Sequence, residues 1–328
     1  MNTATITLGS AYPIPDEERA GSKEPFDHLL GRLNHQSVVK HFDAYADIPW
    51  EDPEFRIDSD DTRWELAPDD PLGSTFWYRS QAPAVRSRLG LYRIATSMKI
   101  GCQFESVLKR GLLEFASTLP NNSPVFRYAY HEVIEEAQHS LMFQEFVNRT
   151  GFDIAGMAAW QRLGSRQVVR FGRTFPELFL VFVLGGEDPI DHVQRTVLHS
   201  GHEIHPLLRR VMQIHITEEA RHICFAREYL RRQVPQLSVS RRFQLAVRAP
   251  VILAIMAQTM MRPSPDMQRR FKVPASVMGE AFTHNPRHRE ATLAALAKTR
   301  ALCEELGIMR PWLWQRLGVW GEPEAATA

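Results

Sequence analysis

The segment His215-Ile216-Thr217-Glu218-Glu219-Ala220-Arg221-His222 carries side chains with the spacing of a metal site. Residues three or four apart lie on the same face of an α-helix, so His215, Glu219 and His222 project in one direction. Two imidazoles and a carboxylate on one face suit a transition metal such as iron. This segment therefore predicts a metal-binding helix face.

A second Glu-x-x-His motif lies upstream, at Glu136-Ala137-Gln138-His139. With 13 His in 328 residues, about one such pair is expected by chance in a chain of this composition. This chain has two, and both have apolar neighbours, such as Val133 in the first and Ile223 in the second. A buried carboxylate is costly unless it is paired or binds a cation. Two Glu-x-x-His helices with two further Glu-bearing helices form the ligand set of a di-iron site in a ferritin-like bundle.

The two remaining carboxylates should come from two other helices. The helix predicted from Arg86 to about Leu119 offers Glu105 and Glu114, and we favour Glu105 because it lies in the apolar middle of the helix. The helix that begins at Pro176 offers Glu187, which follows an eight-residue apolar run and has no basic neighbour. Glu105 and Glu187 therefore complete the predicted set of ligands.

The helices that position these ligands dominate the chain. Apolar residues recur at helical spacing, and no alternating strand pattern occurs, so we predict an all-α fold with a ferritin-like four-helix bundle core and additional peripheral helices. We expect a flexible N-terminal lead-in at 1–25, a single all-helical domain at 26–320 and a polar tail at 321–328. Residues 46–84 are predicted to form a long irregular connection.

Glycine and proline predict where helices break. Gly156, Gly164 and Gly172 should divide residues 152–173 into short pieces. Gly185, Gly186 and Pro189 should disturb the helix around Glu187, as bulges and kinks do at metal sites. A single helix is expected from about Arg287 to Leu306.

Composition excludes several classes of protein. The 39 basic and 38 acidic side chains give a net charge of +1, so no nucleic-acid groove is indicated. Cys102, Cys224 and Cys303 lack the spacing of a disulfide framework or a zinc knuckle. No signal peptide is recognised at the N-terminus, and the most apolar stretches are too short for a transmembrane segment. We therefore expect a cytoplasmic protein.

The order of the motifs resembles that of the p-aminobenzoate N-oxygenase (AurF-like) family of di-iron oxygenases, in the ferritin-like superfamily. The resemblance covers roughly residues 85 to 235, and His215 stands where that family adds a third histidine, one turn before the second Glu-x-x-His. It implies that one iron is held by Glu105 and His139 and the other by Glu187, His215 and His222. Glu136 and Glu219 would bridge the two ions, and we expect these two residues to be catalytic.

The chain departs from the family pattern at two positions that face the substrate pocket in the resemblance. An amide residue four positions after the match to Glu187 is replaced by Asp191, and a tyrosine two turns before Glu105 is replaced by Ser97. If these residues line a pocket, the charge of Asp191 should disfavour a benzoate carboxylate. Asp191 also lies one turn beyond Glu187 on the same helix face, which makes it a candidate to orient a ligand histidine.

The predicted function is that of a di-iron oxygenase acting on O2 and a small-molecule substrate, with N-oxygenation of an arylamine as the leading reaction. The predicted cofactor is two iron ions, for which manganese could substitute, and the protein would need an electron donor, either a reductase or a ferredoxin. C–H hydroxylation or desaturation of an aliphatic or acyl substrate is an alternative. A non-enzymatic ferritin-like iron-binding protein is a second alternative. The sequence is also compatible with a homodimer.

Other candidate residues have simpler interpretations. His199, His202 and His205 lack a carboxylate at ligand spacing, so a solvated helix junction is favoured over a metal tract. Acidic neighbours of the motifs are interpreted as surface acids or as partners of the ligands; these are Glu132, Glu135 and Glu218. Tryptophans near the C-terminus should cap the core; these are Trp312, Trp314 and Trp320. The apolar helix from Leu245 to Met261 is expected to pack on the bundle or to line a substrate tunnel, with an interfacial membrane helix as the less favoured interpretation.

Overall fold

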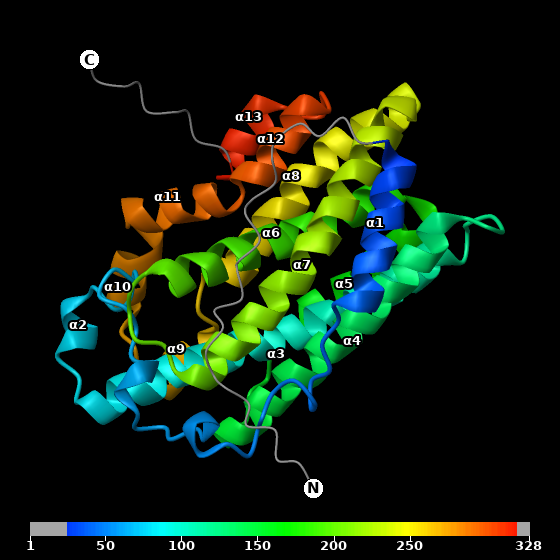
Figure 1. The fold of residues 1–328 in the computed structure, drawn as a ribbon. Coiled ribbons are helices and arrows are strands. Elements are labelled where there is room, and N and C mark those ends of the chain that lie inside the picture. The colour runs from blue at the N-terminus through cyan, green and yellow to red at the C-terminus, as the bar shows by residue number, and fades with distance from the viewer. Residues whose placement is uncertain (1–24, 320–328) are drawn as a thin grey trace, which may run out of the picture.

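The computed structural model describes residues 25–319, and within this range the chain forms helices and loops without a β-strand. The prediction of an all-α fold is confirmed. Figure 1 shows a bundle of long helices with shorter helices against its ends and sides. The predicted polar tail at 321–328 lies outside the described residues, as does the predicted lead-in at 1–25 apart from Pro25.

Four long helices form the centre of the molecule: α3 (Pro83–Ala116), α4 (Pro124–Thr150), α6 (Pro176–His199) and α7 (Pro206–Gln233). Each begins with a proline, which is tolerated there because the first N–H groups of a helix have no partner within the helix. α4 ends at Thr150 and is followed by Gly151, whose φ of 68° is easily reached only without a side chain. The sequence placed these helices within a few residues of their observed bounds.

α6 is one helix through Gly185, Gly186 and Pro189, so the predicted interruption around Glu187 was wrong. The two glycines allow close packing instead. A Cβ on Gly186 would lie 2.1 Å from the ring of Phe104 on α3. A Cβ on Gly185 would lie 2.9 Å from Leu253 of α8 (Val239–Met261). Glycine here permits neighbouring helices to approach the metal-bearing segment of α6.

Other helices cover this core. α5 (Ala159–Thr174) runs through Gly164 and Gly172, which were expected to break it. The remaining helices are α1 (Phe26–Val39), α9 (Pro265–Arg270), α10 (Ala275–Met278), a π-helical turn (Gly279–Thr283), α11 (Pro286–Ala295), α12 (Ala297–Glu305) and α13 (Pro311–Arg316). The single helix expected from Arg287 to Leu306 is therefore divided into α11 and α12.

The connection at 46–84 crosses one end of the bundle (Figure 1) and contains two 3₁₀ turns (Pro53–Phe55 and Thr62–Trp64) and the short α2 (Phe76–Arg79). Trp64 anchors it. The Trp64 ring is buried and stacks on His205, with 4.2 Å between the ring centroids, and it meets the edge of Phe146. A long loop is thereby tied to the bundle by aromatic packing.

The core consists of two apolar clusters separated by a polar layer. One cluster includes Leu108, Leu180 and Phe225. The other includes Leu91 and Val211. The predicted ligands lie on the stretches of the helices between these clusters. A charged side chain at this depth is destabilising unless an opposite charge or a bound cation compensates it.

Candidate metal centre

The structure brings all seven predicted ligands into the polar layer at the middle of the bundle. α3 contributes Glu105, α6 contributes Glu187, and the two Glu-x-x-His motifs lie on α4 and α7. Each of the seven residues is at most 1% exposed. Their ligand atoms form overlapping groups of three, with all atoms of a group within 4.8 Å of one another. The groups draw on all seven predicted ligands, and the group that holds His222 and Glu136 is completed by Glu132.

The carboxylates lack partners that the protein could supply. Glu105 Oε2, Glu187 Oε1 and Glu219 Oε2 are buried without a hydrogen-bond partner among residues 25–319. A buried carboxylate oxygen in this state is strongly destabilising unless a cation satisfies it. Oxygen and imidazole donors with no cysteine among them suit iron or manganese. The residues present therefore fit a pair of metal ions.

The acids of this layer perturb one another's pKa values. Burial raises the pKa of Glu105 well above its ordinary value, and the charges of Glu136 and Glu187 raise it further. The pKa of Glu187 rises in the same way, through burial and the charges of Glu219 and Glu136. For Glu136, burial opposes ionisation, but a hydrogen bond from Glu105 and the charge of His222 outweigh it and lower the pKa. Such crowding of acids is characteristic of a site built for cations.

His139 and His222 point one ring nitrogen at the carboxylates. His139 Nδ1 lies 3.2 Å from Glu136 Oε2 and 3.3 Å from Glu219 Oε1. His222 Nδ1 lies 3.1 Å from Glu136 Oε1 and 3.2 Å from Glu219 Oε1. The two Nδ1 atoms therefore face the same pair of acids, Glu136 and Glu219, which are the predicted bridging residues.

The other nitrogen of each histidine binds an acid from the opposite helix. His139 Nε2 on α4 lies 2.9 Å from Glu218 on α7, and His222 Nε2 on α7 lies 2.8 Å from Glu135 on α4. Arg221 joins the two acids, with its Nη2 3.0 Å from Glu135 and 3.5 Å from Glu218. A carboxylate on the outer nitrogen fixes the tautomer and the ring orientation, so that the inner nitrogen is free to bind a metal.

This crossed arrangement was not predicted in detail. The sequence interpretation left Glu135 and Glu218 as surface acids or ligand partners, and both are buried and hold a histidine. A signal was present, because Glu135-Glu136-Ala137-Gln138-His139 and Glu218-Glu219-Ala220-Arg221-His222 share the pattern Glu-Glu-Ala-x-His. The leading acid in each copy turns away from the ligand set of its own helix. Glu132 lies beside them, buried, with its pKa raised to about 8 by burial.

His215 has a different partner. Its Nδ1 lies 3.0 Å from Gln194 Oε1, and its Nε2 lies 3.7 Å from both Glu105 and Glu219. Burial lowers the pKa of His215 to about 4, so the ring is neutral near pH 7 and Nε2 can act as a ligand. Asp191, the predicted candidate for orienting a histidine, instead forms an ion pair with Arg195 at 2.8 Å.

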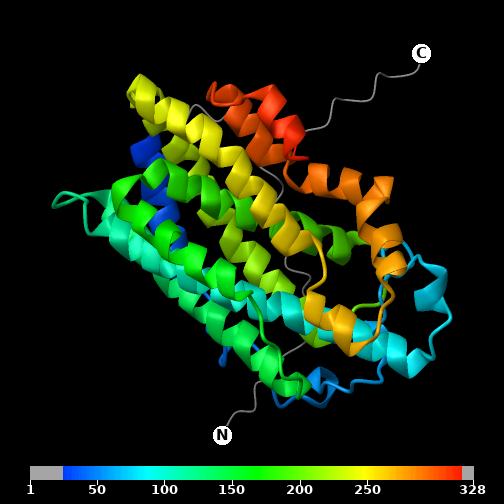
Figure 2. The same cartoon turned by 180° about the vertical axis from the view of Figure 1, so that it is seen from behind.

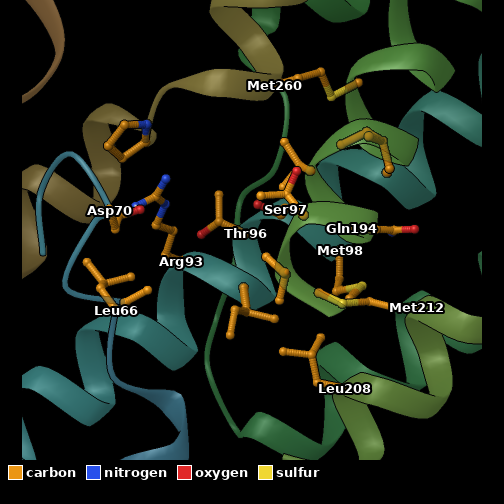
Figure 3. Close-up of a pocket in the computed structure, with 18 of the residues that line it drawn as sticks. Leu66, Asp70, Arg93, Thr96, Ser97, Met98, Gln194, Leu208, Met212 and Met260 are labelled. Carbon is orange, nitrogen blue, oxygen red and sulfur yellow. The ribbon is translucent and has the colours of Figure 1, made fainter. Parts of the chain in front are cut away.

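A cavity of about 600 Å³ opens onto one side of the ligand set. Glu105, Glu187 and His215 form part of its wall. Ser97 also lines it, as predicted for a pocket residue, whereas Asp191 is absent from the lining because it is turned toward Arg195 on its own helix. Figure 3 shows the labelled lining residues, which are Leu66, Asp70, Arg93, Thr96, Ser97, Met98, Gln194, Leu208, Met212 and Met260.

The remaining sequence candidates lie elsewhere. His205 caps the N-terminus of α7 by accepting a hydrogen bond from the Leu207 N–H. None of the three histidines at this junction belongs to a metal-ligand group within the described range. Trp314 is fully buried, in agreement with a core-capping role, while Trp312 is 64% exposed. Trp320 lies outside the described residues.

Comparison with known proteins agrees with this site. A family profile described as P-aminobenzoate N-oxygenase AurF matches residues 24–307, a range that holds every predicted ligand. The chain belongs to this family. Membership confirms the predicted ferritin-like class and implies an oxygenase with a di-iron centre.

The similar curated proteins come from mycobacteria. Uncharacterized protein MT0908 of Mycobacterium tuberculosis (strain CDC 1551 / Oshkosh) is 39% identical over 298 residues, which cover 90% of this chain and 88% of that protein. Uncharacterized protein Mb0909 of Mycobacterium bovis (strain ATCC BAA-935 / AF2122/97) gives the same identity and coverage. No solved structure matches the chain.

Proposed function

We propose that this protein binds two iron ions and uses O2 to oxidise the nitrogen of an arylamine. The observation that carries the proposal is the cavity whose wall includes Glu105, Glu187 and His215. A small molecule in this cavity would lie against three ligands of the metal centre. A storage protein has no need of an organic-sized cavity at this position, so an enzyme is favoured over the ferritin-like alternative.

The seven ligands divide between two ions in this proposal. Glu105 and His139 would hold one iron, while Glu187, His215 and His222 would hold the other. Glu136 and Glu219 would bridge them, which agrees with their position between the Nδ1 atoms of His139 and His222. When bound, the ferrous ions supply electrons for the reduction of O2, and manganese would satisfy the same donors. A reductase or a ferredoxin would restore the electrons after each turnover.

The protein would prepare the site in two ways. Glu218 and Glu135 hold the two motif histidines so that their Nδ1 atoms face inward. Phe104, Phe143 and Ile100 line the cavity, where their apolar side chains would exclude water from the reacting atoms.

The cavity favours a substrate without a negative charge. Three arginines line it, and each is already engaged. Arg93 pairs with Asp70 at 2.6 Å. Figure 3 shows the two side chains next to each other. Arg63 pairs with Asp61 at 2.6 Å, and Arg262 donates to the Phe282 carbonyl. A benzoate carboxylate would find no free counter-ion here, so a neutral arylamine is the proposed substrate class.

Oxidation of a C–H bond in an aliphatic or acyl substrate is the second candidate. The inner lining is rich in flexible apolar side chains, among them Met98, Leu208, Met212 and Met260. Methionine adapts to substrates of different shape, and a long apolar chain would match this surface. The same metal centre would serve both reactions.

Product analysis distinguishes the two reactions. The iron-loaded protein would be reduced chemically and exposed to ¹⁸O₂ with aniline, 4-methylaniline, p-aminobenzoate and the methyl ester of a medium-chain fatty acid. We expect ¹⁸O-labelled hydroxylamine or nitro products, formed about tenfold faster from the neutral amines because p-aminobenzoate lacks a counter-ion. Labelled alcohols alone would favour C–H oxidation. The absence of labelled product from protein with two irons would contradict the proposal.

A further inference from the structure

α5 and α8 lie side by side, and we call their exposed sides together the α5–α8 face. The two helices are antiparallel and are joined at both ends. Gln161 at the start of α5 donates to Thr259 near the end of α8 at 2.8 Å. Arg241 at the start of α8 donates to the Thr174 carbonyl at the end of α5 at 3.0 Å. Both helices lie on the side of the molecule turned toward the viewer in Figure 2.

This face is strongly basic in a chain that is nearly neutral overall. Neither helix contains an acidic residue, while together they carry Arg162, Arg166, Arg170, Arg173, Arg241, Arg242 and Arg248. Those on α5 recur at a spacing of three or four residues and therefore share one side of the helix. Arg166, Arg170, Arg173 and Arg248 are exposed and form no ion pair with any residue from 25 to 319.

Large apolar side chains stand among these arginines. Trp160 is 62% exposed and Leu163 is 64% exposed on α5. On α8, Phe243 is 59% exposed, and Val251 and Ile255 are each 41% exposed. Exposed tryptophan and aliphatic side chains beside arginine are the composition of a helix that lies in a membrane interface.

α8 supports this interpretation through its own hydropathy. The segment Val239–Arg270, which holds α8 and α9, is long and apolar enough to cross a membrane by length and composition, contrary to the expectation that the apolar stretches of the chain are too short. Only 39% of its apolar 18-residue window is buried. The inner side is committed to the bundle, since Leu253 packs on Gly185 of α6. The outer side therefore keeps its apolar residues exposed while the helix stays attached to the protein.

α4 provides a contrast. It also exposes apolar side chains, including Phe126, Tyr130, Ile134 and Leu141. Its sequence, however, contains acidic residues as well as basic ones and has no excess of arginine. Charge complementarity to an anionic surface is found on the α5–α8 face and not on α4.

We propose that the α5–α8 face docks onto the surface of a bilayer that contains anionic lipids. The arginines would pair with lipid phosphates, and Trp160, Leu163 and Ile255 would enter the boundary of the acyl chains. Thr259, which binds α5, also lines the cavity, so docking would place one edge of the cavity near the lipid. A lipophilic substrate could then enter from the bilayer; this second step rests on the proposed function, whereas docking itself does not.

Co-sedimentation with vesicles tests the docking. The full chain loaded with iron would be mixed with phosphatidylcholine vesicles with or without 30% phosphatidylglycerol. We expect binding only to the anionic vesicles and a loss of about tenfold in bound fraction for the triple variant Trp160→Gln, Leu163→Gln, Ile255→Gln. The matched control is Val39→Gln, Phe76→Gln, Ile134→Gln, which removes three exposed apolar side chains from α1, α2 and α4 and should bind like the unchanged protein.

The charge contribution has its own test. Arg166→Gln with Arg170→Gln should weaken binding and reduce its dependence on salt, because fewer lipid charges are neutralised. Equal binding by the apolar test and control variants would overturn the proposal, as would an absence of binding to anionic vesicles. Binding to an acidic plant-type ferredoxin in place of vesicles would also overturn it and assign the face to a protein partner. Circular dichroism would establish that each variant is folded.

Discussion

The two sides of the metal centre are built differently. One side faces away from the cavity, and we call it the closed side. There, His139 and His222 are each held by a carboxylate from the opposite helix, and Arg221 joins the two carboxylates. On the cavity side, His215 is held by the neutral amide of Gln194, and Glu105 and Glu187 each have an oxygen without a partner. The closed side also accepts a backbone N–H from the loop after α1, since Phe42 donates to Glu218.

This difference suggests a division of labour. Charged, crossed hydrogen bonds fix the geometry of the closed side and make it costly to disturb. A single neutral hydrogen bond on the cavity side leaves the ligands there easier to move when a substrate or O2 arrives. We therefore expect substitutions on the closed side to affect iron binding most, and substitutions on the cavity side to affect reactivity more than iron content.

The largest effect should come from removing a carboxylate that belongs to both sides. Glu219→Ala deletes an acid that lies beside both His139 and His222, and iron analysis of the purified variant should show most of one equivalent lost per chain. Glu114→Ala is the matched control, because Glu114 is the other acid considered on α3 and belongs to no ligand group. Full iron content in Glu219→Ala would contradict the bridging role.

Arg221→Met tests the closed side without touching a ligand. Loss of the guanidinium leaves Glu135 and Glu218 as neighbouring buried charges, so the two histidines should be less well held. We expect iron affinity, measured by competition with a chelator, to fall roughly 10- to 100-fold. Arg88→Met, which removes an exposed ion pair with Asp60, should leave the affinity unchanged. An unchanged iron affinity in Arg221→Met would show that the hydrogen bonds of the closed side do not strengthen iron binding.

Gln194→Leu tests the cavity side. The variant removes the acceptor that orients His215, so the reaction of the reduced protein with O2, followed by stopped-flow absorbance, should slow by about tenfold while iron content stays near two per chain. Gln194→Glu keeps an acceptor at the same position and should recover most of the rate. A loss of iron as large as that in Arg221→Met would show that the two sides do not differ.

The smallest effect is expected for Asp191→Asn. Asp191 faces Arg195 and not the cavity, so the ratio of rates for aniline and p-aminobenzoate should stay within about twofold, and stability should fall by about 0.5 kcal/mol in thermal unfolding. Ser97→Leu, which does fill part of the cavity, should change that ratio more. If Asp191→Asn raised the rate for p-aminobenzoate and not that for aniline, Asp191 would line the substrate pocket, as predicted from the sequence.

Spacing along a single helix was enough to predict much of this site. The pairs Glu136 with His139 and Glu219 with His222 follow from helical geometry alone, and the apolar surroundings identified Glu105 and Glu187 as buried acids. The sequence could not show which acid would face which histidine across two helices. Glu135 and Glu218 therefore remained ambiguous until the packing of α4 against α7 was known.

The predictions for Gly185 and Gly186 and for Asp191 failed for related reasons. Gly185 and Gly186 are helix breakers by propensity, but packing against Leu253 and Phe104 required their small size and overrode that preference. Asp191 lies one turn after Glu187, which suggested a shared direction. The Asp191 carboxylate instead forms an ion pair with Arg195, four residues later on the same helix, and does not face the cavity.

The exchange of acids between α4 and α7 has a consequence for how the centre fills. Glu218 of α7 holds the histidine proposed for one ion, and Glu135 of α4 holds a histidine proposed for the other. Capture of a first ion would therefore fix the register of both helices and prepare the vacant half for the second. The histidine of each half is held by an acid from the helix that carries the histidine of the other half. Iron loading should therefore be cooperative, and little protein with a single iron should be present when less than two equivalents are added.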